Sequence, residues 1–344
     1  MSSGSTSGKT LRIALDAMGG DFAPANEVAG ALSYLGSNLD IPVEIVLVGD
    51  QTLIEGELKK SNPKKRIRER ISIHHTTEVI TMDDDASAPL KTKKDSSMTR
   101  GMYLCKEGNA DAFLSAGNTG AMLATSTIIL GRVQGVHRPT IGTFFPTSQG
   151  KPTLIIDAGA NIDAKPRFLY EFAIMGNLYY KLMFGVQSPA IALLNIGEEP
   201  SKGTEAVQEA HKMLADSKLN FIGNLEGRDI FNGNADVMVC DGFVGNIILK
   251  FAESFLSFFK STLENYASKK TFNKLKVGLT VPTLRDVFRE FDYQEYGGVP
   301  LLGVNGTVII GHGKSTPKAI HNMISRSVEV VKSDFNKKLE EALA

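Results

Sequence analysis

The stretch V-M-V-C-D-G-F-V-G-N-I-I-L-K, residues 237–250, decides the fold class of this chain. Its first four residues, 237–240, are apolar, which is typical of a strand that is buried on both faces. A polar turn with two glycines follows, and from Ile247 onward apolar residues recur at helical spacing. A strand, a turn and a helix in this order predict an α/β fold. The turn is expected at the carboxyl end of a parallel strand, where such sheets bind ligands.

Short apolar strands alternate with helices along the rest of the chain, which predicts a parallel sheet with helices on both faces. The chain is expected to end in one long helix over residues 317–343. The expected strands are residues 11–15, 43–48, 71–74, 112–114, 141–145, 153–156, 190–194, a strand near Phe221, 237–240 and 308–310.

We expect a single α/β unit over residues 10–344, because no stretch has the composition of a linker. The Ser/Gly-rich residues 1–9 contain no apolar segment and predict a disordered leader, not a signal peptide. Residues 255–291 mix bulky apolar with basic side chains and predict a protruding helical insertion. One interpretation of the insertion is a dimer interface with part of the core. The other is contact with a membrane surface, where apolar side chains enter and basic ones meet anionic lipid.

The composition is that of an ordinary folded enzyme-sized chain: 344 residues, 42% apolar and 22% charged. Lys plus Arg and Asp plus Glu both number 38, so the net charge is zero. This argues against nucleic acid as the main partner, because neutralising phosphates requires a basic excess. The two cysteines, Cys105 and Cys240, make no disulfide framework and favour a reducing cytoplasm. No apolar run reaches the about 18 residues that predict a membrane-spanning helix.

Loops rich in Gly, Asn and Asp follow five of the expected strands, at residues 16–21, 115–120, 157–161, 195–203 and 241–246. One such loop is an ordinary turn with a helix cap. Five of them on one edge of a sheet predict a crevice that handles phosphate. The loop S-A-G-N-T-G at 115–120 is the best candidate for an anion cradle, because its glycines permit close approach and the next helix offers free N–H groups.

Other chemistries have little support. The chain contains no G-x-S-x-G elbow, no complete G-x-G-x-x-G fingerprint, no H-E-x-x-H and no C-x-x-C. Residues 311–315, G-H-G-K-S, resemble the end of a P-loop, but Val308 stands where the first glycine is required. We interpret Glu198 and Glu199 as solvent-facing acids, and we expect neither a metal ion nor a cofactor.

Six strings together resemble the bacterial phosphate acyltransferase family of phospholipid synthesis, PlsX, in that family's order. They are D-A-M-G-G-D (16–21), S-A-G-N-T-G-A (115–121), D-A-G-A-N (157–161), L-L-N-I-G-E-E (193–199) with K-G (202–203), C-D-G-F-V-G-N (240–246) and P-L-L-G-V-N-G (300–306). The resemblance implies a three-layer, Rossmann-like core similar to the phosphotransacetylase and isocitrate/isopropylmalate dehydrogenase folds.

The resemblance also implies transfer of an acyl group from acyl carrier protein to inorganic phosphate. The acyl phosphate would be used by a membrane glycerol-3-phosphate acyltransferase. The family is homodimeric and associates peripherally with the membrane from the cytoplasm, so the same is expected here.

The reaction needs little beyond positioning and charge stabilisation, because phosphate is already nucleophilic and a thiol with a pKa of about 8.5 leaves readily. It needs a cation beside phosphate and a donor to the oxyanion. We assign these catalytic roles to Lys202 and Asn246. The residues expected to bind phosphate or substrate are Asp16, Gly19, Gly20, Ser115, Gly117, Asn118, Thr119, Gly120, Asn161, Asn195, Asp241, Gly245 and His312.

An acidic carrier protein requires a basic docking surface. The sequence contains three candidate surfaces and does not distinguish among them. One lies in the insertion. The other two are Lys64, Lys65, Arg66, Arg68 and Arg70, and Lys91, Lys93, Lys94 and Arg100.

Three rival functions stay open at this point. The first is an acyl-CoA or acetyl phosphotransferase on the same fold. The second is a decarboxylating dehydrogenase, which would require clustered metal-binding aspartates and arginines. The third is a membrane-binding adaptor without enzymatic activity.

Overall fold

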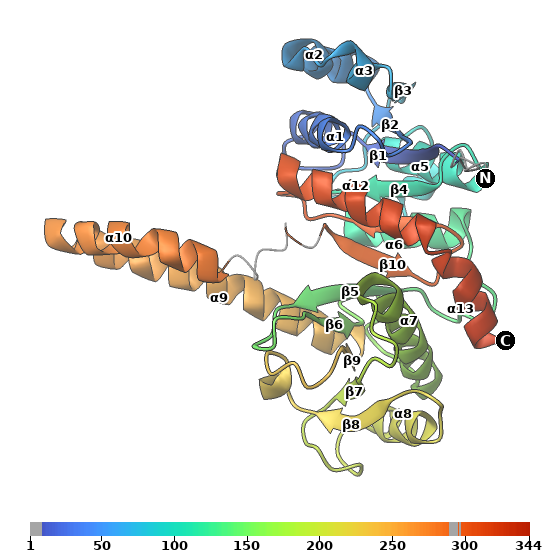
Figure 1. Cartoon of the computed structure of the whole chain (residues 1–344). Coiled ribbons are helices and arrows are strands. Elements are labelled where there is room, and N and C mark those ends of the chain that lie inside the picture. The colour runs from blue at the N-terminus through green and yellow to red at the C-terminus, as the bar shows by residue number, and fades with distance from the viewer. Residues whose placement is uncertain (1–8, 289–294, 296) are drawn as a thin grey trace, which may run out of the picture. The chain divides into compact units, whose positions relative to one another are not determined.

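The computed structural model describes residues 9–288, 295 and 297–344. They form two compact units, which can be followed by colour in Figure 1: unit 1 is Met1–Pro139 with Tyr296–Ala344, and unit 2 is Thr140–Glu295. The sequence predicted one unit over 10–344. It gave no sign of the division because the chain passes from Pro139 straight into a strand, without a Gly- or Ser-rich linker. The predicted leader lies outside the described residues except for Lys9.

Unit 1 is built on a sheet with the strand order β3-β2-β1-β4-β11-β10. Its strands are parallel except for β10 beside β11. The strands are β1 (Leu11–Asp16), β2 (Val43–Gly49), β3 (Ile71–His75), β4 (Ala112–Ser115), β10 (Val299–Leu302) and β11 (Thr307–Ile310). The helices are α1 (Ala25–Ser37), α2 (Gln51–Ser61), α3 (Lys65–Arg68), α4 (Pro89–Thr92), α5 (Ser97–Lys106), α6 (Thr119–Ile129), α12 (Pro317–Lys332) and α13 (Phe335–Leu343).

Helices cover both faces of the unit 1 sheet, which gives three layers. On one face, Ile13 and Leu15 of β1 pack with side chains of α1 and α12 in a single buried cluster. On the other face, Gly101 of α5 lies so close to the ring of Phe113 that no side chain would fit there. Alternate residues of each central strand therefore enter opposite cores, as buried parallel strands require.

Unit 2 has the strand order β5-β6-β9-β7-β8, and only β5 beside β6 is antiparallel within it. The strands are β5 (Thr140–Phe145), β6 (Thr153–Ile156), β7 (Ile191–Leu194), β8 (Phe221–Leu225) and β9 (Val237–Val239). The helices are α7 (Pro166–Phe184), α8 (Glu205–Ala215), the short 3-10 turn η1 (Gly227–Asp229), α9 (Gly242–Ser268) and α10 (Thr271–Phe288). The start of α9 packs on one face of the sheet through Val244 and Ile248, and Gly176 of α7 lies against Val237 on the other.

The predicted strands and helices are present, but three expectations about them were wrong. The sheets are mixed, because the short connections β5–β6 and β10–β11 can only join antiparallel strands. Strand β10 was missed. The closing helix is two helices, α12 and α13, separated at Asp334, whose left-handed φ of 54° ends the helical path.

The predicted insertion is helical, but it does not begin at residue 255. Helix α9 runs without interruption from the sheet edge into this region, and α10 returns beside it (Figure 1). Residues 289–291 of the prediction lie outside the described residues. In the part of the chain that the structure describes, α9 is also the one helix long and apolar enough to cross a membrane, judged by length and composition alone. Its first turns nevertheless belong to the core of unit 2.

Candidate functional site

Loops at the carboxyl ends of β1, β4 and β11 are bonded to one another in unit 1. Asp16, the last residue of β1, is buried, and its Oδ2 accepts a 2.7 Å hydrogen bond from Oγ of Ser115. That Oγ accepts the N–H of Gly117 at 3.0 Å, and the carbonyl of Ser115 accepts the N–H of Gly311 at 2.8 Å. Burial raises the pKa of Asp16, while hydroxyl bonds from Ser115 and Ser97 act in the opposite direction. The structure therefore joins residues that the sequence assigned to one phosphate site.

Gly19 and Gly20 lie directly on this buried polar group. A Cβ on Gly19 would be 2.7 Å from Oδ2 of Asp16 and 2.7 Å from Oγ of Ser115. A Cβ on Gly20 would collide with the carboxyl group of Glu27. The loop leaves room for backbone alone, which is the property expected of an anion cradle.

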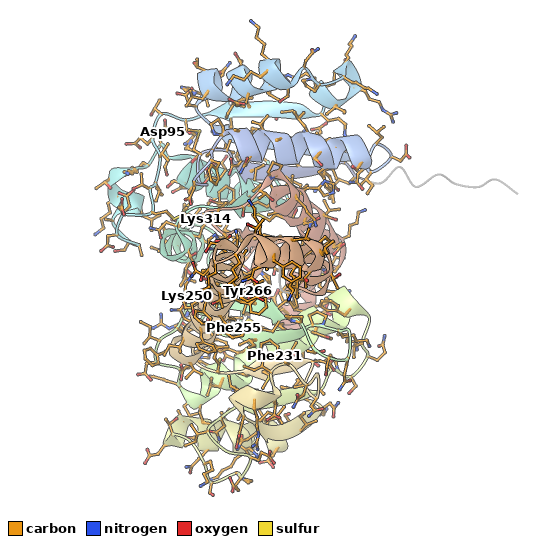
Figure 2. All side chains as sticks on the ribbon, turned by 90° about the vertical axis from the view of Figure 1, so that its left-hand side faces the viewer. Asp95, Phe231, Lys250, Phe255, Tyr266 and Lys314 are labelled. Carbon is orange, nitrogen blue, oxygen red and sulfur yellow. The ribbon has the colours of Figure 1, made fainter. Side chains whose placement is uncertain are left out.

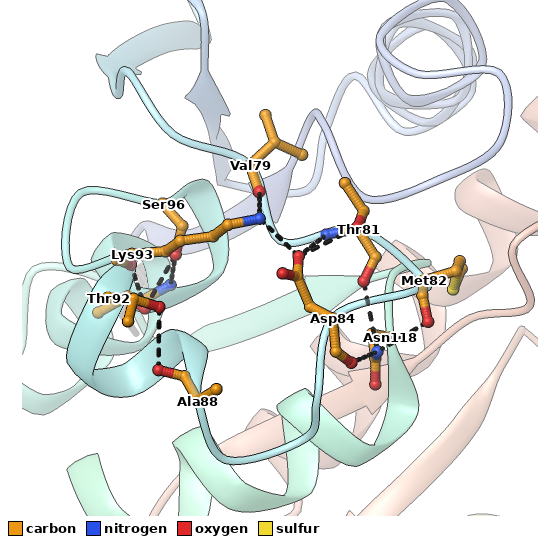
Figure 3. A network of polar contacts seen from close by, with 10 residues as sticks. Val79, Thr81, Met82, Asp84, Ala88, Thr92, Lys93, Ser96 and Asn118 are labelled. Atoms are coloured by element: carbon orange, nitrogen blue, oxygen red, sulfur yellow. Dashed lines mark hydrogen bonds and ion pairs between the residues drawn. The ribbon is translucent and has the colours of Figure 1, made fainter.

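Asn118 uses its whole side chain within the fold. Its Oδ1 accepts the N–H of Ala121 at 3.0 Å and so caps α6. Its Nδ2 donates to the carbonyls of Thr81, Met82 and Asp84 at 3.3, 3.2 and 3.0 Å (Figure 3). The sequence predicted Asn118 as a phosphate ligand, whereas here it fastens the loop after β3 to the start of α6.

Lys93 closes the same loop from its other end. Its Nζ donates to the carbonyl of Val79 at 2.8 Å and pairs with Oδ2 of Asp84 at 2.6 Å (Figure 3). That Oδ2 also accepts the N–H of Thr81 at 2.6 Å. The hydrogen bond from Lys93 is the largest of several influences that lower the pKa of Asp84. Lys93 thus belongs to a structural network and not to a free basic surface.

The remaining predicted residues of unit 1 lie on the rim of these loops. Thr119, which starts α6, is exposed, and a Cβ on Gly120 would lie 2.9 Å from that of Ala86. His312 is exposed in the loop after β11, and its Nδ1 accepts the N–H of Lys314 at 3.1 Å. That bond leaves the proton of a neutral imidazole on Nε2.

In unit 2, three predicted residues follow three adjacent strands. Asn161, Asn246 and Lys202 come after β6, β9 and β7, which are parallel neighbours in that order. Neighbouring strands are about 4.8 Å apart and end at the same edge. The arrangement confirms that these loops share the carboxyl edge of one sheet, as the strand–turn–helix pattern predicts.

Asp157 organises the loop after β6, although it is not among the site residues that the sequence predicts. This buried carboxylate accepts the N–H groups of Gly159 and Ala160 on Oδ1, at 3.0 and 2.8 Å. On Oδ2 it accepts both the backbone N–H and Nδ2 of Asn161, at 2.8 and 2.7 Å. Burial raises the pKa of Asp157, and these donors oppose that rise. An Asp directly after an apolar strand and before Gly and Asn is the signal that could have identified it.

Asp241 caps α9, because its Oδ1 accepts the N–H of Val244 at 2.8 Å. The N–H of Gly242 donates to the carbonyl of Asn161 at 2.7 Å. A Cβ on Gly242 would lie 2.8 Å from backbone atoms of Asn161. The loop after β6 and the first turn of α9 are therefore in direct backbone contact.

Asn246 is placed by the same contact. Gly245 touches the carbonyl of Asp157, and a Cβ on Gly159 would be 3.4 Å from Oδ1 of Asn246. The side chain of Asn246 is exposed on the first turn of α9. Its side-chain amide is therefore accessible, and the backbone that carries it is fixed by the loop after β6, as the predicted role of amide donor requires.

Asn195 shapes the loop that carries Lys202. Its Oδ1 accepts the N–H of Ile196 at 2.9 Å, and its Nδ2 donates to the carbonyl of Lys202 at 3.0 Å. Lys202 is exposed, and Thr204 caps α8 just after it. The predicted supporting role of Asn195 thus has a geometric basis, and Lys202 lies in the loop two residues before the N-cap of α8.

Glu198 and Glu199 are both exposed. Glu198 forms an ion pair of 3.3 Å with Arg228, so its carboxylate is engaged on the surface. Within the described ranges, no three His, Cys, Asp or Glu side chains gather as a metal site would require.

Both the sequence and the fold of this chain are similar to those of known proteins. Residues 11–338 match the family described as "Fatty acid synthesis protein". The chain is 46% identical over 333 residues to a phosphate acyltransferase of Thermodesulfovibrio yellowstonii, covering 97% of this chain and 94% of that protein. It is 46% identical over 331 residues to a phosphate acyltransferase of Heliobacterium modesticaldum, covering 96% and 97%.

Solved structures are similar at much lower identity. A phosphotransacetylase from Streptococcus pyogenes has a TM-score of 0.61 at 18% identity, covering 95% of both chains. A phosphotransacetylase from Staphylococcus aureus has a TM-score of 0.58 at 17% identity, again covering 95% of both chains. These similarities concern the fold alone, and they confirm the fold class predicted from the sequence.

Proposed function

Because this chain belongs to the phosphate acyltransferase family, we propose that it moves a fatty acyl group from the thioester of acyl carrier protein to inorganic phosphate. Acyl transfer to phosphate is the activity of the family at this level of identity. The acyl carrier protein as donor is our proposal. So is the use of the acyl phosphate by a membrane glycerol-3-phosphate acyltransferase for phosphatidic acid synthesis. One observation carries the assignment of roles: Asn161, Asn246 and Lys202 follow three adjacent parallel strands.

The chemistry asks for positioning more than for a strong base. A phosphate oxygen attacks the thioester carbonyl carbon and forms a tetrahedral oxyanion. Collapse of this intermediate breaks the C–S bond and releases the pantetheine thiolate, the anion of a thiol whose pKa is about 8.5. Asn246 donates its amide to the oxyanion, and Lys202 holds phosphate or balances the developing charge. Asp157 acts through the loop that supports Asn246.

In unit 1, the loops at the ends of β1, β4 and β11 supply backbone N–H groups for phosphate. Gly19 and Gly20 give the anion access to the backbone, while the N–H of Gly117 is bonded to Ser115, which is held in turn by Asp16. Asn118 contributes by fixing the start of α6, since both ends of its amide are engaged.

The first experiment incubates the purified protein with a long-chain acyl carrier protein, with and without phosphate, and follows acyl phosphate and free thiol. Phosphate-dependent formation of both supports the proposal. Absence of both from folded protein contradicts it.

Variants then test the assigned residues. Asn246→Ala is expected to lower kcat by about 10²- to 10³-fold, the usual effect of removing an oxyanion donor. Asn109→Ala, an exposed asparagine in the turn after α5, and Lys212→Ala, an exposed lysine of α8, are the matched controls. Near-normal turnover of both Lys202→Ala and Asn246→Ala would remove the basis for their roles.

The rival donor is a coenzyme A thioester. Similarity to the phosphotransacetylase fold favours keeping this alternative. Comparison of kcat/KM for acyl carrier protein and coenzyme A thioesters of one chain length separates the two, and a higher value for coenzyme A would favour the rival.

We also propose that α9 and α10, the hairpin, contact a second copy of the chain and the membrane surface. Large apolar side chains are exposed along both helices, among them Phe251 at 69% and Leu279 at 74%. Figure 2 labels Lys250, Phe255 and Tyr266 of α9, in a view along the hairpin with its tip toward the viewer. Such a surface is typical of an interface or a lipid contact.

The two roles of the hairpin separate experimentally. Polar replacement of Leu263, Phe272 and Val277 is followed by vesicle sedimentation, with and without anionic lipid, and by light scattering. Unchanged vesicle binding would rule out membrane contact through these side chains. An unchanged dimer mass in light scattering would rule out self-association through these side chains.

The candidate docking surfaces for the carrier protein can be reduced, because some of their basic side chains are already hydrogen-bonded within the fold. The guanidinium of Arg70 donates to the carbonyls of Val43, Asn38 and Ile41, at 2.8, 3.2 and 2.5 Å. Lys93 is engaged in its own network. We therefore propose docking over the exposed lysines of the three predicted surfaces, which are Lys64, Lys65, Lys91, Lys94 and the lysines of the hairpin. A KM for the carrier that does not rise with salt would contradict this.

A further inference from the structure

Glu27 is a buried acid that the proposed mechanism does not yet use. It lies in the first turn of α1 and is 1% exposed. Its Oε2 has no hydrogen-bond partner in the part of the chain that the structure describes. Ionising this carboxyl group would be unfavourable, because burial has removed its hydration and one of its two oxygens has no donor to replace the lost water.

The carboxyl group lies beneath the loop that the proposed function gives to phosphate. A Cβ on Gly20 would collide with Oε1 of Glu27, so the carboxyl group meets the backbone of Gly20 directly. The preceding residue, Gly19, has the same relation to Asp16 and Ser115. Two buried carboxyl groups therefore support two consecutive residues of one loop.

Two ionised carboxylates at Asp16 and Glu27 would repel a bound anion, so one of the two carboxyl groups must keep its proton. A phosphate dianion above the loop would face both Asp16 and Glu27 across a single layer of backbone. Burial raises the pKa of Asp16 as well, but hydrogen bonds from Ser115 and from the N–H of Met18 oppose that rise by stabilising its ionised form. Glu27 lacks such donors on Oε2, so it is the member of the pair suited to remain neutral.

We propose that Glu27 is a positioning residue of the phosphate cradle, which holds the Gly20 backbone as a neutral carboxylic acid while the anion is bound. The inference rests on the proposed function, since it takes phosphate to be the anion bound by the unit 1 loops. Phosphate binding to protein with ionised Glu27 then takes up one proton from solvent onto that carboxylate.

The electrostatics agree with this geometry. Burial, the largest cause, raises the pKa of Glu27 to about 7; the hydrogen bond from its own backbone N–H opposes that rise, and the charge of Asp16 adds to it. The charged and titratable groups on the adjoining segments are Asp16 at the end of β1, Asp21 in the loop after it, and His312 and Lys314 after β11, and helix α12 carries Lys318, His321, Arg326, Glu329 and Lys332.

The test is the KM for phosphate in the wild type and in Glu27→Gln, measured from about pH 6 to about pH 8.5. Glutamine mimics the neutral acid. Phosphate titrates identically in both assays, so its own ionisation cancels in the ratio of the two KM values. The wild-type KM divided by that of Glu27→Gln should be near one at pH 6 and rise to about tenfold at pH 8, as one proton with a pKa near 7 requires. The kcat values should stay similar.

Glu340→Gln, an exposed acid of α13, is the matched control and should give a ratio that does not change with pH. A pH-independent ratio for Glu27→Gln would reduce Glu27 to an ordinary structural residue and overturn the proposal. A raised KM for Glu27→Gln at pH 6 would overturn it too, because a neutral side chain should serve there.

A second measurement needs no variant and no turnover. Calorimetry of the unmodified protein with sulfate at about pH 7.5, in buffers of different ionisation enthalpy, counts protons taken up on binding a dianion that does not itself titrate. Uptake of a large fraction of one proton supports the proposal, and no uptake, or no binding of sulfate, counts against it. If acyl transfer to phosphate were absent while sulfate bound with proton uptake, the proposed function would fail and the role of Glu27 would stand.

Discussion

The α-carbon of Gly245 lies against the carbonyl oxygen of Asp157, so closely that no side chain can be placed there. The contact joins the first turn of α9 to the loop after β6. It fixes the position of Asn246, the next residue along the helix.

Gly245→Ala is accordingly expected to lower the free energy of unfolding by about 3 kcal/mol, the upper range for forcing a methyl group into a packed site. The control is Gly56→Ala, at a helical glycine of α2 with open space around it. That change should stabilise by about 0.5–1 kcal/mol, because alanine is the better helix former. Urea unfolding of both variants checks the pair, and a Gly245→Ala curve that coincides with wild type would show that the contact yields easily.

Asp157→Asn should loosen the loop after β6. The carboxylate accepts four N–H groups. An amide in its place turns an NH₂ group toward two of those donors, which leaves buried groups unsatisfied at about 1–3 kcal/mol each. Because the loop supports Asn246, kcat should fall more than the KM for phosphate rises. Asp163→Asn, at an exposed acid just beyond this loop, is the control. Equal stability and equal kcat in the two variants would contradict the role given to Asp157.

Asn118→Asp should separate the two functions of Asn118. The helix cap survives, because aspartate is as good an N-cap as asparagine. The bonds to the carbonyls of Thr81, Met82 and Asp84 are lost, since a carboxylate has no donor. Hydrogen exchange of residues 81–85 should therefore become faster. Asn118→Ala loses the cap as well and should cost about 1 kcal/mol more. Unchanged exchange in Asn118→Asp would mean that the loop is held without this amide.

Glu27 should make stability depend on pH. Its pKa is raised from 4.5 to about 7 in the folded protein, so between these values the folded state binds more protons than the unfolded chain. The free energy of unfolding then falls as pH rises from about 4.5 to about 7 and levels off above, by roughly 3 kcal/mol in total. Glu27→Gln should remove this fall. Urea midpoints of both proteins at pH 5 and pH 7.5 measure it, and parallel changes in the two would show that Glu27 titrates normally.

The sequence predicted the individual strands and helices well, because the pattern of apolar residues within each segment shows which of its side chains are buried. The run 237–240 and the apolar spacing after it are sufficient for β9 and the start of α9. What it missed depends on partners elsewhere in the chain. Strand β10 contains a proline, and it is the pairing with β11, its neighbour in the sheet, that makes it a strand. Asp334 ends α12 by adopting a left-handed conformation, which no Gly or Pro announces.

The candidate site shows the same division. The strings around Asp16 and Ser115 predicted polar loops, and the structure confirms that their side chains bond to each other. The sequence could not show that Asn118 is engaged by carbonyls of residues 81–84, or that Lys93 pairs with Asp84. Polar residue types indicate what an atom can bond to. The fold decides what it does bond to. Lys202 and Asn246 keep their predicted roles as proposals, with accessible side chains on a shared sheet edge.

Helix α9 has one more consequence. No Gly or Pro interrupts residues 246–268, so Asn246 and Phe258 stand on one stiff rod, twelve residues and about 18 Å apart. The inner end is held at Gly242 and Gly245 by the loop after β6, while the outer turns lie beside α10 and expose aromatic side chains such as Phe258. Because the helix is continuous, a displacement of its outer aromatic side chains would be transmitted along the helix axis to the turn that carries Asn246.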